Sequence, residues 1–369
     1  MNASGLRAKE LHERTRIAAI APTRSTSGAA IYSRKLYSRL PAEIIPGEKP
    51  ALLVLRNAFG HRVDAYHIQF EYRGFGGFAK SLLSLVLLAS ILSLKRPVVL
   101  TFHGIVTPDG LQGRKLKKIV MLAYLASYKL AAHFSSLVVV HSAAMRSALG
   151  NHYGITKTVV VPIGTDPARS DVQKSSNPSN LVFYGFVRPG KGVENIILAL
   201  KQIKRPDTQL VICGGLARGE EAGYLAHLER SVTENSLDGQ VKFINRSMTE
   251  LEKLAYFSEA LALVLPYTDR FVEASAVVHD FAGFATPIIC SRTPRFAELI
   301  DGYDCIKVEP TPAQIAKAIT VLQNDKALWT SLANNLLRKT TEESWEEVAK
   351  KHLEIYRSVI ISQIRNDGS

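Results

Sequence analysis

The chain has 369 residues, more than one hydrophobic core usually supports, so its length predicts two domains. Its three cysteines, Cys213, Cys290 and Cys305, lie in or beside apolar runs, which argues against a disulfide framework and favours a reducing cytoplasm. Up to Ser170 the chain holds 23 Lys and Arg against 8 Asp and Glu, whereas the remainder holds 23 against 25. The basic half predicts an anionic partner such as a phospholipid, a phosphorylated lipid or a nucleic acid, although such a charge excess is as often a solvated face.

The first apolar runs bear on export and on membranes. The run from Ile17 to Pro22 is too short for the core of a signal peptide, so we expect no export. Within the apolar stretch Phe78 to Leu94, the uninterrupted part from Ser81 is shorter than the roughly 18 residues that a membrane span needs. We interpret it as a buried or surface-docking helix. With the basic cluster Arg114 to Lys118, it predicts a cytoplasmic protein that docks on the inner face of an anionic membrane.

Short apolar runs alternate with helical patterns along the whole chain, which is typical of an α/β fold with parallel sheets. The polar stretch Asp166 to Asn180 separates two such series and is interpreted as a linker. We therefore predict two open α/β domains, residues 1–170 and 171–349, with ligands at the carboxyl ends of the strands. The predicted strands are Ile17 to Pro22, Ala51 to Leu55, Ala65 to Ile68, Val98 to Phe102, Leu137 to His141, Thr158 to Ile163, Leu181 to Tyr184, Thr208 to Cys213, Val241 to Ile244, Ala262 to Pro266, Pro287 to Cys290 and Cys305 to Val308.

The segment from Leu181 to Ile203 reads as a buried strand, a tight turn and a helix, with Arg188 and Lys191 inside the turn. Unpaired backbone N–H groups at a helix start, beside two cations, suit a phosphate or a pyrophosphate. A surface turn with two solvated cations explains this segment equally well. In the first half, Gly28 opens a helix after a Ser/Thr-rich loop, where the lack of a side chain lets a ligand approach the backbone. A GxGxxG dinucleotide fingerprint is absent from both halves.

An ordered series of motifs resembles the retaining family-4 glycosyltransferases of the GT-B fold. The resemblance covers nearly the whole chain. It implies two Rossmann-like domains that face a cleft, the first for the acceptor and the second for a nucleotide-sugar donor, with a C-terminal helix of about residues 350–369 packing back on the first. The motifs are HIQFEY (67–72), TFHG (101–104), VVVHS (138–142), VVPIGTD (160–166), the opening segment 181–203, VICGG (211–215), FINRS (243–247), the stretch 273–291 and ESWEEVAKKHLEIY (343–356).

The resemblance also implies roles for particular residues. Lys191 and Arg188 would neutralise the leaving phosphate, and His103 matches the histidine that lies near the transferred sugar. Phe186 stands where many relatives have an arginine, so Arg188 is expected to supply the second cation. The acceptor would contact His67, Gln69 and Glu71, which alternate at a strand end. The donor would contact Gly28, Gly185, Gly215, Asn245, Arg246, Glu273, Ala274, Ser275 and Asp280.

The acidic motif of the family, two glutamates separated by seven intervening residues, is altered in this chain. Asp280 takes the second position and can still accept hydrogen bonds from ribose hydroxyls. Val272 takes the first position, so either Glu273 reaches the sugar after a one-residue shift or that contact is lost. Ala274 and Ser275 could place backbone N–H groups on a phosphate.

The sequence has no Asp-x-Asp triplet and no metal-ligand spacing, so we expect no metal and no cofactor beyond the nucleotide-sugar co-substrate. The resemblance implies transfer with retention to a glycan or lipid-linked acceptor. A non-catalytic module of the same fold, binding a nucleotide, a glycan or an anionic surface, is the alternative. Nucleic-acid binding is disfavoured because the basic half lacks a recognition element.

Overall fold

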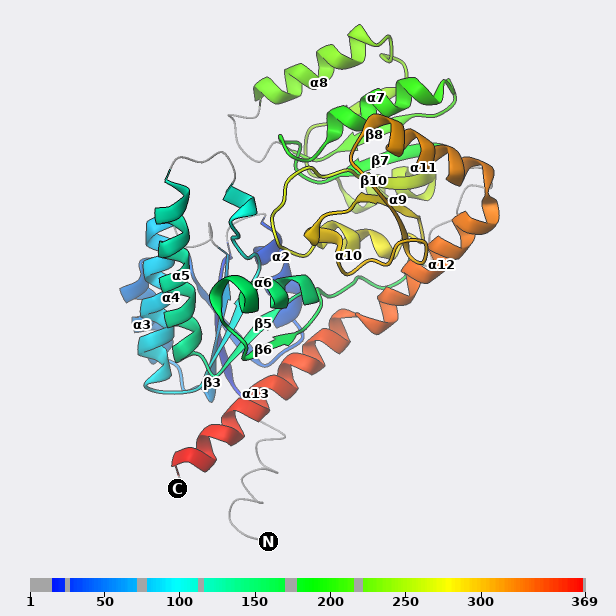
Figure 1. Ribbon diagram of the computed structural model, residues 1–369. Helices are drawn as coiled ribbons and strands as arrows, with labels where there is room; N and C mark the ends of the chain where they lie inside the picture. The colour runs from blue at the N-terminus through cyan, green and yellow to red at the C-terminus, as the bar shows by residue number, and fades with distance from the viewer. Residues whose placement is uncertain are drawn as a thin grey trace. The chain divides into compact units, whose positions relative to one another are not determined.

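The computed structural model describes residues 15–23, 27–71, 78–111, 116–169, 178–215 and 222–367. It forms two compact units, each with its own hydrophobic core (Figure 1). The first unit holds the described residues up to Gly164, together with Phe271–Ala274 and the chain from Glu343 onward. The second holds Thr165–Arg270 and Ser275–Glu342. The chain therefore changes units at residue 165 rather than 171, and a four-residue segment of the expected donor domain belongs to the first unit.

The first unit is built on a six-stranded sheet of order β2-β1-β3-β4-β5-β6, in which every strand pair is parallel. All residues of β1, β3 and β4 are buried, so these central strands are covered on both faces. The strands are β1 (Ile17–Ala21), β2 (Ala42–Pro46), β3 (Ala65–Phe70), β4 (Val98–Phe102), β5 (Leu137–Val140) and β6 (Thr158–Val160). The α-helices are α2 (Gly28–Tyr37), α3 (Ala51–Phe59), α4 (Phe78–Ser93), α5 (Lys117–Phe134), α6 (Ala143–Tyr153) and α13 (Trp345–Asp367).

The prediction of a strand at residues 51–55 was wrong, because these residues begin α3. The segment is rich in alanine and leucine, which favour helices, and only its residues Val54, Leu55 and Ala58 face the core, at helical spacing. Leu52 is 78% exposed. The strand in this region is β2, an edge strand in which Ile45 alone is buried. An edge strand carries little of the apolar pattern that marks the central strands.

The second unit repeats the design with a parallel sheet of order β12-β11-β10-β7-β8-β9, and the predicted α/β class is confirmed. The strands predicted for this half are present, with small shifts at their ends. They are β7 (Asn180–Tyr184), β8 (Leu210–Cys213), β9 (Val241–Ile244), β10 (Ala260–Leu265), β11 (Ile288–Ser291) and β12 (Cys305–Val308). The helices are α7 (Val193–Ile203), α8 (Ala222–Glu234), α9 (Glu250–Ser258), α10 (Ala276–Ala282), α11 (Pro312–Asn324), α12 (Lys326–Glu342) and the 3-10 turn η3 (Pro294–Phe296).

Helix α13 belongs to the first unit and packs against α2. Its residue His352 is fully buried and lies 2.8 Å from the hydroxyl of Tyr32 on α2. At the start of the helix, the ring of Trp345 packs over Gly164 so closely that a Cβ atom there would lie 2.2 Å from it. A glycine is therefore required at position 164.

The membrane prediction concerns α4 and α5, which pack on each other. Among the described residues, no helix combines the length and the apolar character that crossing a bilayer takes. Arg114 and Lys115 of the predicted basic cluster, and residues 170–177 of the predicted linker, lie outside the described residues. The three cysteines are buried thiols without disulfides.

Candidate active site

The turn between β7 and α7 is held by glycine and by the loop that follows β10. Gly192 is the N-cap of α7 and has φ 69°, and a Cβ atom there would lie 2.1 Å from the carbonyl oxygen of Pro266. The carbonyl of Gly190 accepts hydrogen bonds from the backbone N–H groups of Thr268 and Asp269, at 3.0 and 3.2 Å. The loop therefore fixes the turn from the neighbouring strand.

A single carboxylate from this loop pairs with two arginines. Asp269 Oδ2 lies 2.9 Å from Nη2 of Arg188, and Asp269 Oδ1 lies 2.9 Å from Nη2 of Arg295 in η3. The side chains of Asp269 and Arg295 are 9% and 5% exposed. Sequence reasoning found Arg188 but missed Asp269 and Arg295, because they lie far along the chain and belong to no motif that we recognised.

Lys191 completes this cation cluster, which we define as Arg188, Lys191 and Arg295 around Asp269. Lys191 is 8% exposed, and its Nζ lies 3.6 Å above the centroid of the Tyr267 ring. Among the described residues it has no hydrogen-bond partner for its ammonium group. Burial, followed by the charges of Arg295 and Arg188, holds the pKa of Lys191 well below its usual value, although Asp269 works against this shift.

The charges of the cation cluster shift the pKa of Asp269. Burial acts to raise the pKa of Asp269, but the three cations of the cluster outweigh burial and lower this pKa below its ordinary value. The carboxylate is therefore ionised at neutral pH. A bound anion would favour the charged form of Lys191 and would supply the hydrogen-bond acceptor that it lacks.

The ends of β7 and β8 approach each other closely beside this turn. Gly185 has φ 130° and Gly214 has φ 139°, and a Cβ atom at Gly214 would lie 1.9 Å from the carbonyl oxygen of Gly185. The carbonyl of Gly215 accepts a hydrogen bond of 3.2 Å from the N–H of Val187. The predicted site residues Gly185 and Gly215 are therefore brought together at the carboxyl ends of two paired strands.

The aspartate predicted to contact the ribose, Asp280, lies on α10 near a lysine that sequence reasoning missed. Asp280 is half-buried. Burial, the largest contribution, acts to lower the pKa of Lys253, but nearby groups outweigh it and raise this pKa. The charge of Asp280 is one of them. Lys253 Nζ lies 2.9 Å from Oε1 of Glu250 and 5.6 Å from the ring centroid of Tyr184 at the end of β7. Asp280 thus lies in a polar, charged setting at the carboxyl end of β7.

Asn245 and Arg246 follow β9 and are exposed. Arg246 is engaged, because its Nη1 donates to Oε2 of Glu252 at 2.8 Å. The same glutamate closes a capping box with Thr249 at the start of α9. Arg246 is therefore tied to a helix start.

Val272, Glu273 and Ala274, at the first position of the altered acidic motif, belong to the first unit. The N–H of Ile105 donates to the carbonyl oxygen of Val272 at 2.8 Å, and the Val272 side chain is 7% exposed and packs in the core of the first unit. A valine can occupy this apolar position at no electrostatic cost, whereas a glutamate would be desolvated there. Glu273 is half-buried and Ala274 packs against the same core. Ser275 lies in the second unit as the N-cap of α10, which has seven residues.

In the first unit, His103 follows β4 within a chain of polar contacts. His103 Nε2 lies 2.8 Å from Oε1 of Gln69, and its Nδ1 lies 3.2 Å from Nε2 of His141, whose Nδ1 lies 3.0 Å from the carbonyl oxygen of Val161. Three such contacts need three N–H protons, whereas two neutral imidazoles carry two. Burial, with the charges of His141 and His352, holds the pKa of His103 well below its usual value. In the neutral state Gln69 must therefore turn its amide NH₂ toward His103.

His67 and Gln69 are fully buried, since they lie on the central strand β3. His67 Nδ1 lies 2.9 and 2.6 Å from the hydroxyls of Tyr37 and Tyr356, and its Nε2 lies 2.7 Å from Oγ1 of Thr101. Helices α2 and α13, which supply the tyrosines, cover β3 at this point. The burial does not support the expected contact of His67 or Gln69 with an acceptor and makes His67 a structural link between β3, α2 and α13. Glu71, one residue beyond β3, is half-buried.

Gly28 is the exposed first residue of α2 and follows β1 at the same edge of the sheet as His103. The hydroxyl of Ser27 accepts a hydrogen bond of 3.3 Å from the N–H of Ala30 and caps this helix. Within the part of the chain that the structure describes, no three His, Cys, Asp or Glu side chains are grouped as a metal site would need.

Two parallel-sheet α/β units, with a glycine turn and buried cations after the first strand of the second, define a GT-B architecture. Two family models match the sequence. Residues 8–169 match Glycosyltransferase Family 4, and residues 165–342 match Glycosyl transferases group 1. The chain belongs to this family of glycosyltransferases, and the predicted fold and enzyme class are confirmed.

Solved structures support the fold at low sequence identity. HepE from Anabaena, in complex with UDP-glucose, is 17% identical with a TM-score of 0.73, and the match covers 94% of this chain and all of that one. Sucrose-phosphate synthase from Thermosynechococcus elongatus is 19% identical with a TM-score of 0.74, covering 95% and 100% of the two chains. A glycosyltransferase from Rickettsia africae is 14% identical with a TM-score of 0.68, covering 94% and 99%. A comparison with curated protein sequences gave no match.

Proposed function

We propose that this glycosyltransferase moves a sugar from a nucleotide-diphosphate sugar to a glycan or lipid-linked acceptor, with retention of anomeric configuration and without a metal ion. The second unit binds the donor and the first binds the acceptor. The observation that carries the proposal is the ammonium group of Lys191, a residue only 8% exposed, which has no hydrogen-bond partner among the described residues and belongs to a cluster with Arg188 and Arg295. A diphosphate supplies the acceptor that Lys191 lacks.

In the proposed reaction, the bond between the sugar C1 and the β-phosphate oxygen breaks while the acceptor oxygen bonds to C1 on the same face. The proton of the acceptor hydroxyl passes to the departing phosphate. Negative charge grows on that phosphate as the bond breaks, and Lys191 and Arg188 are placed to stabilise it. Cations that are already fixed in a buried cluster stabilise such charge more strongly than water does. His103 is proposed to lie beside the transferred sugar.

The remaining donor contacts are proposed from the positions of the predicted residues. Asp280 accepts hydrogen bonds from the ribose, and Gly185 and Gly215 leave the backbone open beside the phosphates. Asn245 and Arg246 contact the base or a phosphate, as does the backbone at Ser275. Glu273 takes the sugar hydroxyls, with Ala274 beside it, and Gly28 contributes backbone N–H groups.

A binding and turnover experiment tests this proposal. Thermal shift with UDP-, GDP- and ADP-sugars identifies the donor; the complexes of HepE with UDP and UDP-glucose make the UDP-sugars the first to try. Slow hydrolysis of the bound donor that is unaffected by EDTA and lost in Lys191→Ala supports a metal-independent enzyme. Binding without turnover supports the non-catalytic module, which Val272 at the usual glutamate position favours. NMR of the product reports whether the anomeric configuration is retained.

A membrane surface is proposed as the place where the acceptor is met. Helices α3, α4 and α5, which lie side by side in the first unit (Figure 1), contain no Asp or Glu. They carry the cations Lys80, Lys117, Lys118 and Lys129, and they expose apolar side chains. This combination suits the interface of an anionic bilayer. The exposed apolar residues on these helices are Leu52, Leu53, Phe59, Leu83, Ile119, Leu122, Leu130 and Phe134.

Liposome flotation tests the membrane proposal. We expect recovery with vesicles that contain phosphatidylglycerol and loss with phosphatidylcholine alone. Leu122→Gln should reduce recovery, whereas the matched exposed leucine of the second unit, Leu251→Gln, should not. Equal recovery with both kinds of vesicle rejects the proposal.

A further inference from the structure

A second cationic site lies in the first unit, at the amino ends of the strands. Arg16 directly precedes β1, Asp64 directly precedes β3, and Arg96 stands two residues before β4. Because β1, β3 and β4 are parallel neighbours, these residues meet at one edge of the sheet. His103 and Gly28 follow the carboxyl ends of the same strands. The amino-edge site is therefore separate from the candidate active site.

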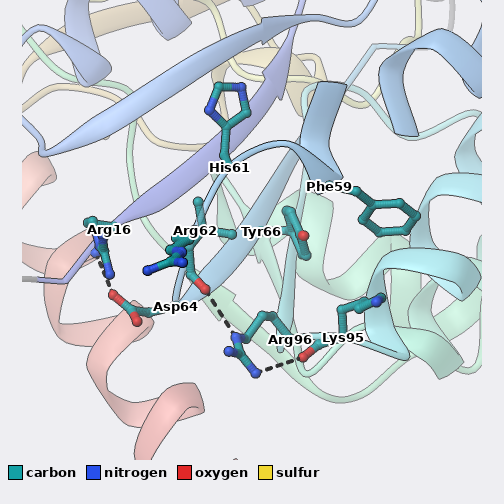
Figure 2. Close-up of a pocket in the computed structure, with 9 residues that line it drawn as sticks. Arg16, Phe59, His61, Arg62, Asp64, Tyr66, Lys95 and Arg96 are labelled. Carbon is teal, nitrogen blue, oxygen red and sulfur yellow. Dashed lines mark hydrogen bonds between the residues drawn. The ribbon is translucent and has the colours of Figure 1, made fainter. Parts of the chain in front are cut away.

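A cavity of about 400 Å³ opens at this amino edge, within the size range of ligand pockets (Figure 2). We call it the amino-edge pocket. Its lining includes four permanent cations and one carboxylate. The lining residues are Arg16, Phe59, His61, Arg62, Val63, Asp64, Tyr66, Lys95 and Arg96.

The framework of the pocket is held by backbone groups. The N–H of Arg16 donates to Oδ2 of Asp64 at 2.8 Å, and the N–H of Asp64 donates to the carbonyl of Arg16 at 2.9 Å. Nε of Arg96 donates to the carbonyl of Val63 at 3.0 Å. Figure 2 shows Arg16, Arg62 and Arg96 around the same opening, with Asp64 beside Arg16. These contacts use backbone groups, so the arginine side chains are not engaged in ion pairs among the described residues.

Several donors in the pocket have no partner. Among the described residues, the guanidinium groups of Arg16 and Arg62 make no hydrogen bond or ion pair, and the hydroxyl of the buried Tyr66 makes no hydrogen bond. Nδ1 of His61 lies 2.6 Å from Oε2 of Glu43, which is not among the lining residues. The negative end of the α4 helix dipole favours a cation at Lys95. It does not explain the positions of Arg16 and Arg62. The mutual repulsion of these cations would be relieved by an anion.

We propose that the amino-edge pocket binds the phosphate group of a small phosphate ester. The four cations outnumber the one carboxylate, Asp64, so the pocket attracts a phosphate anion. The arginines can donate in pairs to the phosphate oxygens, and Tyr66 adds a hydroxyl donor. Phe59 and Leu94, at the ends of α3 and α4, are 43% and 82% exposed beside it. The ester is either the headgroup of a membrane lipid or a free sugar or glycerol phosphate. The proposal does not depend on sugar transfer.

The test compares two double variants that remove the same charge. Arg16→Gln with Arg62→Gln changes the pocket, while Lys204→Gln with Arg205→Gln changes exposed cations of the second unit. Glycerol 3-phosphate is titrated by calorimetry into each variant and into the wild type. The titration is repeated in Lys191→Met, because the cation cluster also attracts phosphate. We expect the pocket variant to bind about tenfold more weakly or worse, given about a fivefold contribution from each cation near a phosphate surface. The Lys204 and Arg205 variant should bind as the wild type does. In Lys191→Met, any binding at the cation cluster should be lost, while binding at the amino-edge pocket should persist.

Flotation with phosphatidylglycerol vesicles then distinguishes the source of the phosphate. If the phosphate belongs to a lipid headgroup, the pocket variant should also lose vesicle binding. Its loss should be larger than that of the Lys204 and Arg205 variant. A free phosphate ester predicts weaker glycerol 3-phosphate binding with unchanged flotation. The proposal is overturned if the wild type shows no saturable binding of glycerol 3-phosphate, if the two double variants lose affinity equally, or if only Lys191→Met loses it. If only Lys191→Met loses binding, the proposed donor site still stands. The two proposals can therefore fail independently of each other.

Discussion

The cation cluster of the second unit and the amino-edge pocket of the first unit hold similar charges in opposite ways. In the cluster, Lys191 and Arg295 are almost fully buried, and the arginines are fixed by one carboxylate. In the pocket, Arg16, Arg62, Lys95 and Arg96 are exposed, and water and salt screen them. The comparison teaches that charge count alone does not distinguish a reaction site from a docking site. Burial decides how strongly each cation acts and how precisely it is placed.

The largest expected effect is on turnover in Lys191→Met, which removes the ammonium group but keeps the length of the side chain. We expect donor turnover to fall by about 10²–10³-fold, the usual loss when one preorganised charge donor is removed. The melting temperature should stay the same or rise, because a buried charge without a hydrogen-bond partner is removed. Lys201→Met, at an exposed position of the helix α7 that follows the turn, is the control. Turnover within twofold of the wild type would falsify the assignment of Lys191.

The next effect is on stability in Asp269→Asn, which leaves Arg188 and Arg295 with a neutral partner. Breaking a buried ion pair from one side costs about 3–5 kcal/mol, and urea unfolding measures it. The diphosphate of UDP should restore part of this loss by supplying negative charge. The matched substitution Asp238→Asn, at an exposed position, should change little. A loss that UDP does not reduce would contradict the view that the cluster holds an anion.

Acid should weaken the first unit before the second. Burial is the main cause that lowers the pKa of His67, His103 and His352, the last to about 3. These groups favour the neutral form in the folded state, so their stabilising contribution is complete above the unfolded pKa of about 6.5 and is lost as the pH falls toward the folded values. Asp269, whose folded pKa is below its ordinary value, loses its contribution only below about pH 4.

The two tryptophans report on the units separately, since Trp345 lies in the first and Trp329 in the second. We expect the fluorescence of Trp345, measured in Trp329→Phe, to change at a higher pH than that of Trp329, measured in Trp345→Phe. If the two acid transitions coincide, the buried histidines do not make the first unit less stable to acid than the second.

The smallest effect is expected in the amino-edge pocket. Arg62→Gln should leave the free energy of unfolding within about 0.5 kcal/mol of the wild type, because its exposed side chain has no partner among the described residues. Salt should weaken phosphate binding in the pocket more steeply than donor binding at the buried cluster. A large stability loss in this variant would mean that the guanidinium group has a structural role.

The apolar pattern made most of the fold predictable. The central strands are continuous buried runs and were found, whereas the edge strand β2 was missed and the leucine-rich start of α3 was taken for a strand. The turn with Arg188 and Lys191 was also predictable, because strand, glycine and helix follow one another along the chain. Asp269 and Arg295 were not, since they come from separate loops and bear no local signal.

The sequence by itself determined the two α/β units, the family and the cations of the turn, because these depend on local patterns of hydrophobicity, glycine and charge. Only the tertiary structure decided which charges are buried and which side chains meet. It paired Arg188 and Arg295 with one carboxylate, enclosed His67 between two tyrosines, and placed Val272 in the core of the first unit. The physical reason is that desolvation and ion pairing depend on neighbours in space, and the order of the residues along the chain does not specify those neighbours.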